Sequence, residues 1–289
     1  MGSCKLLVVF VVVHIVCLLA PASAQSLADM YYKCSRNRNY TNGSAFESNL
    51  SNMMLSYMVS ENEIGNGFYN VSEGLGSDRV YSVALCRGDL KKDACHSCVN
   101  SSSNQLMNYC PNQKEGIMWS NDCMLRYSNH LLYGVLDLRY SYIKWNERDG
   151  LDVDLFNKTL GLLLGALRDR AVAGNASLKY DIGEAKTVNN RTIYALVQCT
   201  PDLYEVLCGR CLDVAISNIP KAIPRKQGGK YLGPSCTIRF QTYKFYDSQS
   251  SVALLPPPTS SNSRTKGSGK KTVIVVVLVA VVFFGALYL

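Results

Sequence analysis

Histidine is scarce in this chain, which has only three among its 289 residues. One of them, His14, lies in an apolar N-terminal run that we expect to be cleaved, so that His96 and His130 remain. Catalysis by a histidine general base is therefore disfavoured. No pair of carboxylates stands out, and the phosphate loop and catalytic loop of a kinase are both missing. We expect a protein that is not an enzyme, with no catalytic residue and no cofactor.

The central part of the chain also lacks a strong excess of one charge. The formal net charge is +8, but Lys5 lies in the N-terminal run and four more basic residues lie near the C-terminus. The rest of the chain has 25 basic residues against 22 acidic ones. Proteins that bind nucleic acid usually carry a clear basic patch, so we expect no nucleic-acid partner.

Residues 1–24 resemble a secretory signal, with Lys5, an apolar run over 6–19 and small residues at 22–24. A short membrane anchor is the alternative for this segment. Ten of the twelve cysteines follow it, an even number that we expect to pair in an oxidising compartment. Eight Asn-x-Ser/Thr sequons also indicate the secretory pathway. The candidate glycosylation sites are Asn39, Asn42, Asn49, Asn70, Asn100, Asn157, Asn175 and Asn190.

The cysteine spacing repeats along the chain. A pattern Cys-x8-Cys-x2-Cys occurs twice, and another cysteine follows each copy after 25 residues. Arg126 and Arg239, and Asp89 and Asp202, keep the same offset of 113 residues. The repeated cysteines are Cys86, Cys95, Cys98 and Cys123, then Cys199, Cys208, Cys211 and Cys236. The chain therefore contains two copies of one disulfide-stapled module.

Each copy shows the same order of predicted elements. Apolar residues at helical spacing over 46–57 and 156–167 predict a first helix, and alternation over 79–87 and 191–199 predicts a strand. Second helices are expected near 94–107 and 207–218. Closing strands are expected over 117–127, 131–142 and 231–246. Helices mixed with hairpins indicate an α+β fold in two tandem modules.

These patterns divide the chain into five parts. A signal over 1–24 precedes a first module over 25–144 and a second over 145–247. A stalk rich in Pro, Ser, Gly and Lys spans 248–271, and residues 272–289 are wholly apolar. Eighteen apolar residues are just long enough to cross a bilayer, which makes the membrane an expected partner. A transmembrane span, a cleaved tail exchanged for a lipid and a receptor shortened at this point remain alternatives.

The first copy reads Cys86 to Cys98 and then Cys123-Met-Leu-Arg126-Tyr127, and the second ends Cys236-Thr-Ile-Arg239-Phe240. This pattern resembles the plant Gnk2-homologous domain, also called the DUF26 or stress-antifungal domain, over about residues 28–247. The resemblance implies two helices packed on a five-stranded antiparallel sheet in each module. Two such modules before a stalk and a membrane segment are similar to the ectodomains of cysteine-rich receptor-like kinases and to plasmodesmata-located proteins.

The resemblance also implies a disulfide pairing. The expected bridges are Cys34–Cys110, Cys86–Cys95, Cys98–Cys123, Cys199–Cys208 and Cys211–Cys236. The second copy lacks counterparts of both Cys34 and Cys110, so no thiol is left over. A zinc site built from the Cys-x2-Cys pairs is disfavoured in a secreted chain. A redox pair formed by Cys95 and Cys98 is the other alternative, and it conflicts with the implied pairing.

The ginkgo antifungal member of this family binds mannose through an Asn, an Arg and a Glu. The matching positions hold Ser35, Ile117 and Ser128 in the first copy, and Lys230 and Gln241 in the second. Only Lys230 keeps a charge, and it lacks the planar fork of arginine, so mannose binding is disfavoured. Arg126 and Arg239 match the arginine that follows the last cysteine of the family, for which a structural role is favoured. Arg126, Lys230, Arg239 and Gln241 are the candidate ligand-binding residues, and no metal site is expected.

We therefore expect a non-enzymatic recognition or assembly protein of the plant cell surface, with plasmodesmata as one location. Its partner would be a cell-wall glycan, a protein ligand, or a homo- or hetero-oligomer of related ectodomains. A carbohydrate-binding antifungal protein and a redox-sensing ectodomain are the alternative functions.

Overall fold

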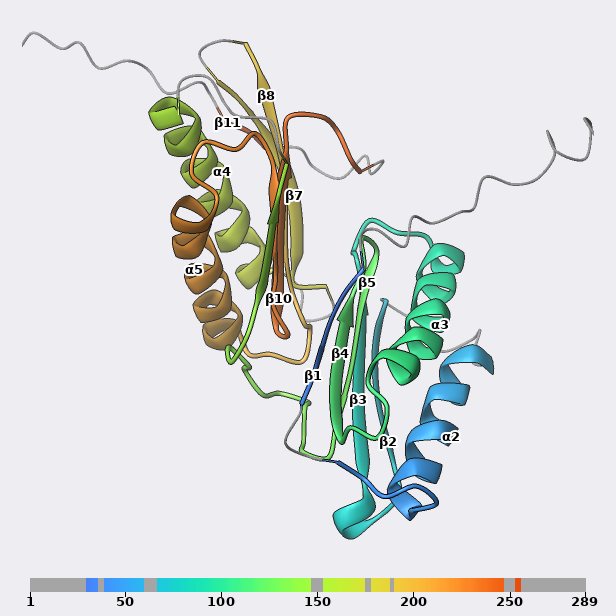
Figure 1. The fold of residues 1–289 in the computed structure, drawn as a ribbon. Helices are drawn as coiled ribbons and strands as arrows, with labels where there is room; N and C mark the ends of the chain where they lie inside the picture. The colour runs from blue at the N-terminus through green and yellow to red at the C-terminus, as the bar shows by residue number, and fades with distance from the viewer. Residues whose placement is uncertain are drawn as a thin grey trace, which may run out of the picture. The chain divides into compact units, whose positions relative to one another are not determined.

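The structure, a computed structural model, describes residues 30–35, 39–59, 67–146, 153–174, 178–187, 190–246 and 253–255 (Figure 1). The predicted signal, most of the stalk and the apolar segment 272–289 lie outside these residues. Among the helices of the described residues, none is both long enough and apolar enough to cross a bilayer. The described residues form the two modules.

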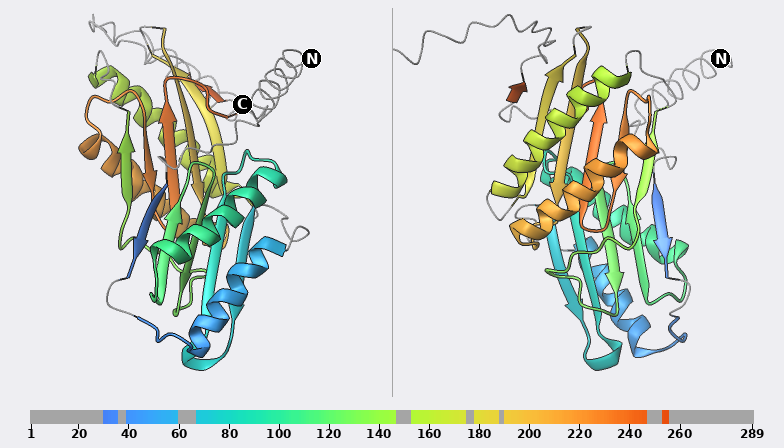
Figure 2. Two further views of the ribbon diagram at one scale, coloured as in Figure 1. Left: turned by 45° about the vertical axis from the view of Figure 1, so that its right-hand side comes forward. Right: turned by 90° about the vertical axis from the view of Figure 1, so that its left-hand side faces the viewer.

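The first module is a five-stranded antiparallel sheet with two helices on one face (Figure 2). The strand order is β1-β4-β5-β3-β2. Its elements in chain order are β1 (Tyr31–Cys34), α2 (Ala45–Val59), β2 (Phe68–Glu73), the 3-10 turn η2 (Gly76–Asp78), β3 (Val80–Cys86), α3 (Lys92–Tyr109), β4 (Glu115–Trp119) and β5 (Cys123–Ser128).

The central strands of this sheet are buried on both faces. Along β3, Ala84 and Cys86 pack under the helices, while Val83 and Leu85 join a separate apolar cluster on the helix-free face. Successive side chains of a strand point to opposite faces, so a strand covered on both sides buries nearly all of its side chains and is mostly apolar. This explains why β3, β4 and β5 contain almost no exposed position, and it requires that something cover the helix-free face.

The second module repeats this architecture with one addition. Its sheet has six strands in the order β11-β7-β8-β10-β9-β6, and β11 pairs with β7 in parallel. Its elements are β6 (Tyr142–Trp145), α4 (Val153–Ala173), β7 (Tyr180–Lys186), β8 (Thr192–Cys199), α5 (Glu205–Ala222), β9 (Gly229–Leu232), β10 (Cys236–Gln241) and β11 (Ala253–Leu255). The predicted class, two helices on a five-stranded antiparallel sheet in each module, is confirmed, and β11 is an additional, parallel strand at the edge of the second sheet.

Two details differ from the expectations. Residues 131–141 form turns and irregular backbone instead of a strand, because they connect the two sheets. The strand that follows, β6, pairs with β9 in the second sheet, so this sheet starts at Tyr142, before the expected module boundary at residue 145. The edge strands β1 and β2, and β7 of the second sheet, had no clear alternating pattern in the sequence and were missed.

Five disulfides hold the helices to the sheets. They are Cys34–Cys110, Cys86–Cys95, Cys98–Cys123, Cys199–Cys208 and Cys211–Cys236, the same pairs that the family resemblance implies. Cys95 and Cys98 are three residues apart on α3 and both are buried, so they face the sheet together. Because they belong to different bridges, these two sulfurs do not form a Cys-x2-Cys redox pair.

The bridge that only the first module has should make a large contribution to its stability. Cys34 and Cys110 are 76 residues apart, whereas Cys86 and Cys95 are only 9 apart. A bridge stabilises the fold by restricting the unfolded chain, and more so when it closes a longer loop. Removing Cys34–Cys110 should therefore lower the free energy of unfolding by about 4 kcal/mol, and removing Cys86–Cys95 should lower it by about 2.5 kcal/mol. We expect Cys34→Ala/Cys110→Ala to unfold at lower urea concentration than Cys86→Ala/Cys95→Ala in the full-length chain. An equal or reversed order would show that core packing outweighs loop closure.

Candidate functional site

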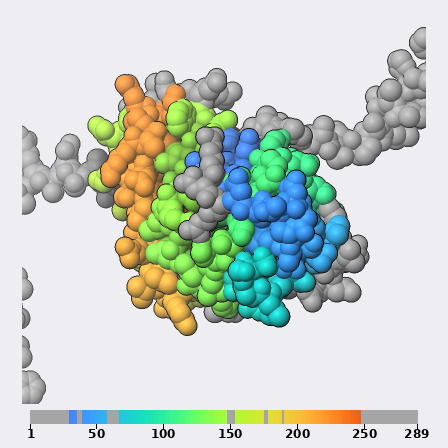
Figure 3. Space-filling view, turned by 60° about the horizontal axis from the view of Figure 1, so that its bottom comes forward, coloured from blue at the N-terminus to red at the C-terminus, as the bar shows by residue number. Residues whose placement is uncertain are grey.

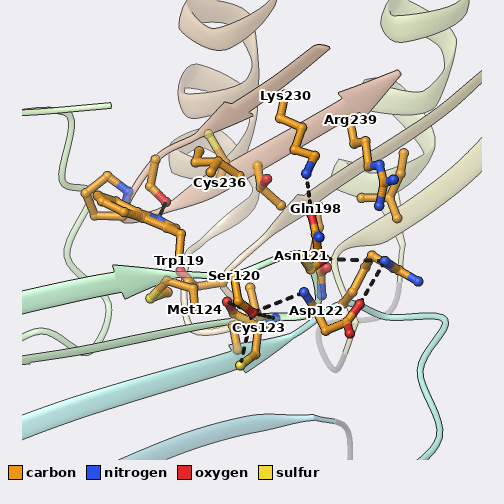
Figure 4. Close-up of a pocket in the computed structure, with 18 residues that line it drawn as sticks. Trp119, Ser120, Asn121, Asp122, Cys123, Met124, Gln198, Lys230, Cys236 and Arg239 are labelled. Atoms are coloured by element: carbon orange, nitrogen blue, oxygen red, sulfur yellow. Dashed lines mark hydrogen bonds and ion pairs between the residues drawn. The ribbon is translucent and has the colours of Figure 1, made fainter. Parts of the chain in front are cut away.

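The helix-free faces of the two sheets meet, and they do so through equivalent positions of the repeat. Leu232 of the second module joins the cluster that covers Val83 and Leu85 of the first. A pocket of about 50 Å³ lies in this contact (Figure 4). Most of its lining residues form pairs at the offset of 113: Leu85 with Gln198, Arg87 with Thr200, Trp119 with Leu232, Ser120 with Gly233, Asn121 with Pro234, Cys123 with Cys236, and Met124 with Thr237.

Hydrogen bonds fix the two modules in register. Trp119 Nε1 donates to Gly233 O at 3.1 Å. Gln198, which is 2% exposed, donates to Cys86 O at 3.0 Å and accepts from Gly88 N at 3.3 Å. Because Gln198 is buried and bonded to main-chain groups, its side chain holds the second module on the end of β3.

The connection between the modules is held in the same way. Asp202 accepts a 2.6 Å hydrogen bond from Gly134 N, and Ser235 Oγ accepts from Asp137 N at 2.9 Å. Figure 3 shows this light-green connecting segment on the surface between the blue part of the first module and the orange part of the second. The connecting segment is therefore held to the second module by hydrogen bonds.

Arg126, a predicted ligand residue, is closed off inside the first module. Its guanidinium is 3.4 Å from Asp137, and both side chains are buried. Arg139 bridges Asp137 and Glu115 from the solvent side. Burial lowers the pKa of Arg126, and the charge of Asp137 acts in the opposite direction. Arg126 thus has a structural role, because its charge is compensated within the protein.

Burial would raise the pKa of Asp137, but hydrogen bonds from the side chain and backbone of Arg139, with the charges of Arg139 and Arg126, hold it below its ordinary value. Of the other positions matched to the ginkgo protein, Ile117 lies in the apolar cluster between the sheets. Ser128 lies opposite Glu115, and Ser35 N donates to Glu115 O. In the part of the first module that the structure describes, Ile117 and Ser128 are therefore closed off from solvent.

The second module keeps the equivalent site open. Lys230 and Arg239 lie opposite each other on β9 and β10, and Lys144 of β6 lies opposite Lys230 on the other side. These three cations, with Trp145, Asn146, Gly229, Gln241 and Tyr243, line a cleft of about 120 Å³ that we call the cationic cleft. None of these lining residues is acidic.

Arg239 has a different environment from its counterpart Arg126. Its guanidinium lies 4.1 Å from the Phe245 ring centroid and bonds the Tyr243 side chain. Among the described residues, no carboxylate forms an ion pair with it within 4.0 Å. Burial lowers the pKa of Arg239, and the nearby charge of Arg87 lowers it further, while the hydrogen bond with Tyr243 and the charges of Tyr243 and Asp122 act in the opposite direction. The Nε atoms of Arg126 and Arg239 are both buried without a hydrogen-bond partner.

The other two predicted ligand residues also lie in the cationic cleft. Lys230 Nζ bonds Asn121 Oδ1 of the first module, as Figure 4 shows. Gln241 Oε1 accepts from Asn146 Nδ2 at 2.7 Å. Lys230, Arg239 and Gln241 are therefore brought together, whereas Arg126 is separate from them.

Sequence reasoning missed Lys144, Trp145, Asn146 and Tyr243. Trp145 and Tyr243 are 46% and 54% exposed, and they provide the aromatic surface of the cleft. Their signal was weak, because β6 lay across the expected module boundary and Tyr243 follows the last strand of the repeat. One of the two tryptophans of the chain, placed next to a lysine and an asparagine, was the available clue.

The predicted glycosylation sites differ in accessibility. Asn39, Asn42, Asn70 and Asn190 are exposed, whereas Asn49, Asn100 and Asn157 are half-buried. Asn49 Nδ2, the atom that would carry a glycan, donates to Asp78 O at 2.9 Å. Asn175 lies outside the described residues.

The closed site of the first module makes a prediction about stability and pH. Asp137→Asn leaves Arg126 buried without a counter-charge, and should lower the free energy of unfolding by about 3 kcal/mol at neutral pH. Because the pKa of Asp137 is lowered in the fold, its contribution is complete above its ordinary value of 3.8 and is lost as the pH falls below it. Urea unfolding should show a difference between wild type and Asp137→Asn that is constant at pH 5–7 and shrinks below roughly pH 4.

The control for this measurement is Asp213→Asn, which removes a carboxylate that is 60% exposed and paired with Arg168. An exposed ion pair contributes little, so this change should alter stability far less. Equal effects of the two substitutions would contradict a structural role for the Arg126–Asp137 pair.

Comparison with known proteins places these features in a family. The chain is 35% identical to an antimicrobial ginkbilobin-2-like protein of Castanea crenata, over 76% of this chain and 89% of that protein. It is 34% identical to the cysteine-rich repeat secretory protein 38 of Arabidopsis thaliana, over 78% of this chain and 88% of that protein. It is 35% identical to the cysteine-rich receptor-like protein kinase 29 of the same plant, of which it covers only 35%.

Solved structures have the same fold. The tandem DUF26 ectodomain of the Arabidopsis thaliana cysteine-rich receptor-like protein PDLP8 matches with a TM-score of 0.63 and 23% identity, over 74% of this chain and 97% of that one. The ectodomain of PDLP5 matches with a TM-score of 0.60 and 26% identity, over 74% and 98%. The profile of the salt stress response/antifungal family matches residues 33–130 and 147–243. The chain therefore belongs to this family, and it carries two tandem copies of the family domain.

Proposed function

We propose that this protein is a non-enzymatic recognition protein of the plant cell surface, and that its ligand binds in the cationic cleft of the second module. The observation that carries the proposal is the difference between the two copies. In the first, ion pairs and the apolar Ile117 close the site. In the second, three cations, two half-exposed aromatic rings and two amides line an open cleft.

The composition of the cleft favours binding over catalysis. Its described lining contains no carboxylate, histidine or thiol, which are the usual general acids, bases and nucleophiles. Aromatic rings beside amides and amines are suited to a sugar, since a ring packs on the apolar face of a pyranose while polar groups bond its hydroxyls. A cell-wall glycan is therefore the ligand class that we favour, and a related ectodomain is the alternative partner.

A glycan array probed with the full-length protein tests this proposal. We expect binding that Trp145→Ala and Tyr243→Ala each weaken at least tenfold, because both remove a ring from the cleft. Tyr32→Ala is the matched control, because Tyr32 is 50% exposed on β1 of the first module. Silence across the array would favour protein–protein assembly, and equal loss with Tyr32→Ala would place binding elsewhere.

We also propose that the protein is attached to the plasma membrane through residues 272–289, with its modules outside the cell. The support is an uninterrupted apolar segment after a polar stalk, in a chain whose residues 1–24 are predicted to be a secretory signal. Exposed sequons in both modules agree with passage through the secretory pathway.

Deletion of residues 272–289 should release the protein into the medium, because no other segment of comparable length and apolarity follows the signal. Phosphatidylinositol-specific phospholipase treatment of the undeleted protein then separates the two modes of attachment. Release indicates a lipid anchor, and retention indicates a transmembrane span. Undeleted protein already free in the medium would contradict both.

A further inference from the structure

The two sheets have four edge strands, β1 and β2 in the first sheet and β6 and β11 in the second. The outer side of an edge strand presents unpaired N–H and C=O groups, on which a strand of another molecule can pair. Natural proteins prevent such pairing with short edge strands, with lysine or proline on the edge, or with a segment that covers it. Each of the four edges therefore needs a feature of this kind if the protein is to stay unpaired.

Three of the four edges have such a feature. The strands β1 and β6 are only four residues long, and each carries an exposed lysine, Lys33 and Lys144. The strand β11 is only three residues long and covers β7, which would otherwise be the edge of the second sheet. Three prolines at 256–258 follow β11 in the sequence, and proline has no N–H group with which a ladder could continue.

The fourth edge, β2, has none of these features. It is six residues long, and among the described strands it pairs only with β3 (Figure 1). It contains neither lysine nor proline, and its one charged residue, Glu73, is at its last position. In the middle of the strand lies the sequon that begins at Asn70 and ends at Ser72. A glycan on Asn70 would therefore be attached to the one edge that has no other protection.

The backbone of Asn70 faces the open side of β2. Cys86 N donates to Gly67 O at 2.7 Å, so these two residues form a hydrogen-bonded pair of the antiparallel ladder. Hydrogen-bonded and non-hydrogen-bonded pairs alternate along such a ladder. Asn70 lies opposite Val83, three positions further along, and this pair is therefore of the non-hydrogen-bonded kind. The N–H and C=O groups of Asn70 thus point away from β3, toward the open edge.

The Asn70 side chain also has room for a glycan. Phe68 packs on the apolar cluster of the helix-free face, and residues two apart on a strand share a face. Asn70 and Ser72 therefore lie on the same face as Phe68, and both are exposed. The sequon asparagine Asn49 of the same module differs, because its Nδ2 atom donates to Asp78 O at 2.9 Å and its side chain is half-buried.

We propose that Asn70 carries an N-linked glycan, and that this glycan prevents the open edge of β2 from pairing with β2 of a second copy of the chain. A glycan is bulky and solubilising. At the middle of the edge it keeps another strand from approaching to the spacing of about 4.8 Å that a ladder requires. The glycan thus has the role on β2 that lysine has on β1 and β6. This inference goes beyond the ligand site and does not depend on what the cationic cleft binds.

Peptide mapping of the full-length protein from plant cells tests the modification. Peptide N-glycosidase A removes a plant glycan from a peptide and converts the asparagine that carried it to aspartate. After this treatment we expect position 70 to be aspartate in most copies and Asn49 to remain asparagine. Unmodified Asn70 would overturn the inference. If Asn42 is modified and Asn70 is not, the secretory route stands and the inference alone is wrong.

Co-purification of two differently tagged full-length copies from the same cells tests the role of the glycan. Ser72→Ala removes the sequon and keeps Asn70, and it should increase co-purification several-fold over wild type, as should Asn70→Gln. Asn70→Lys also lacks the glycan but places a lysine on the edge, so it should behave as wild type. Asn42→Gln is the matched control, because it removes an exposed sequon in a turn outside the sheet, and it should also behave as wild type.

Three results would contradict the shielding of β2. If Ser72→Ala co-purifies no more than wild type, the glycan does not prevent self-association. If Asn70→Lys associates as strongly as Asn70→Gln, the contact does not run through the edge of β2. Equal association of Asn42→Gln would show an effect of glycan loss in general. All four variants should fold, as checked by far-ultraviolet circular dichroism, because each of them changes an exposed side chain.

Discussion

The fold depends on how two disulfides share one end of each sheet. Cys86 and Cys123 are direct neighbours on β3 and β5, yet each bonds to the helix above them instead of to the other. Cys199 and Cys236 repeat this arrangement under α5. Two bridges to adjacent turns of one helix prevent it from rotating or sliding on the sheet.

With the helices fixed on one face, the other face of each sheet is available for the contact between the modules. That contact uses the same positions on both sides, but the residues there have diverged. Gln198 takes the place of Leu85 and bonds main-chain groups of the first module. Ile117 lies in the shared apolar cluster, whereas its equivalent Lys230 turns to Asn121 and to the cleft. The site of the second module thus exists because the modules contact each other through matching but unequal surfaces.

The sequence was informative where a pattern had a single physical cause. The offset of 113 residues predicted the repeat, and helical spacing such as Phe156, Leu160 and Leu164 located the helices, because the stripe that faces a sheet must be apolar. Edge strands such as β1 and β6 were missed, since an edge has one open side and needs no regular alternation. Arg126 and Arg239 looked alike in sequence. The two arginines differ in structure because Arg126 is paired with Asp137. Asp137 lies in the segment that connects the modules, outside the repeated pattern, so the repeat did not predict this pair.

The pairing of equivalent but unequal residues also limits how such chains can be rearranged by recombination. A chain built from two copies of the first module would set Trp119 against a second Trp119 where Leu232 now lies, and would lack Gln198 to accept from Gly88 N. Gly88 itself is packed so closely on the Tyr180 ring that an added Cβ would lie 2.6 Å from it. Each module therefore presents a surface that fits the other module better than a second copy of itself.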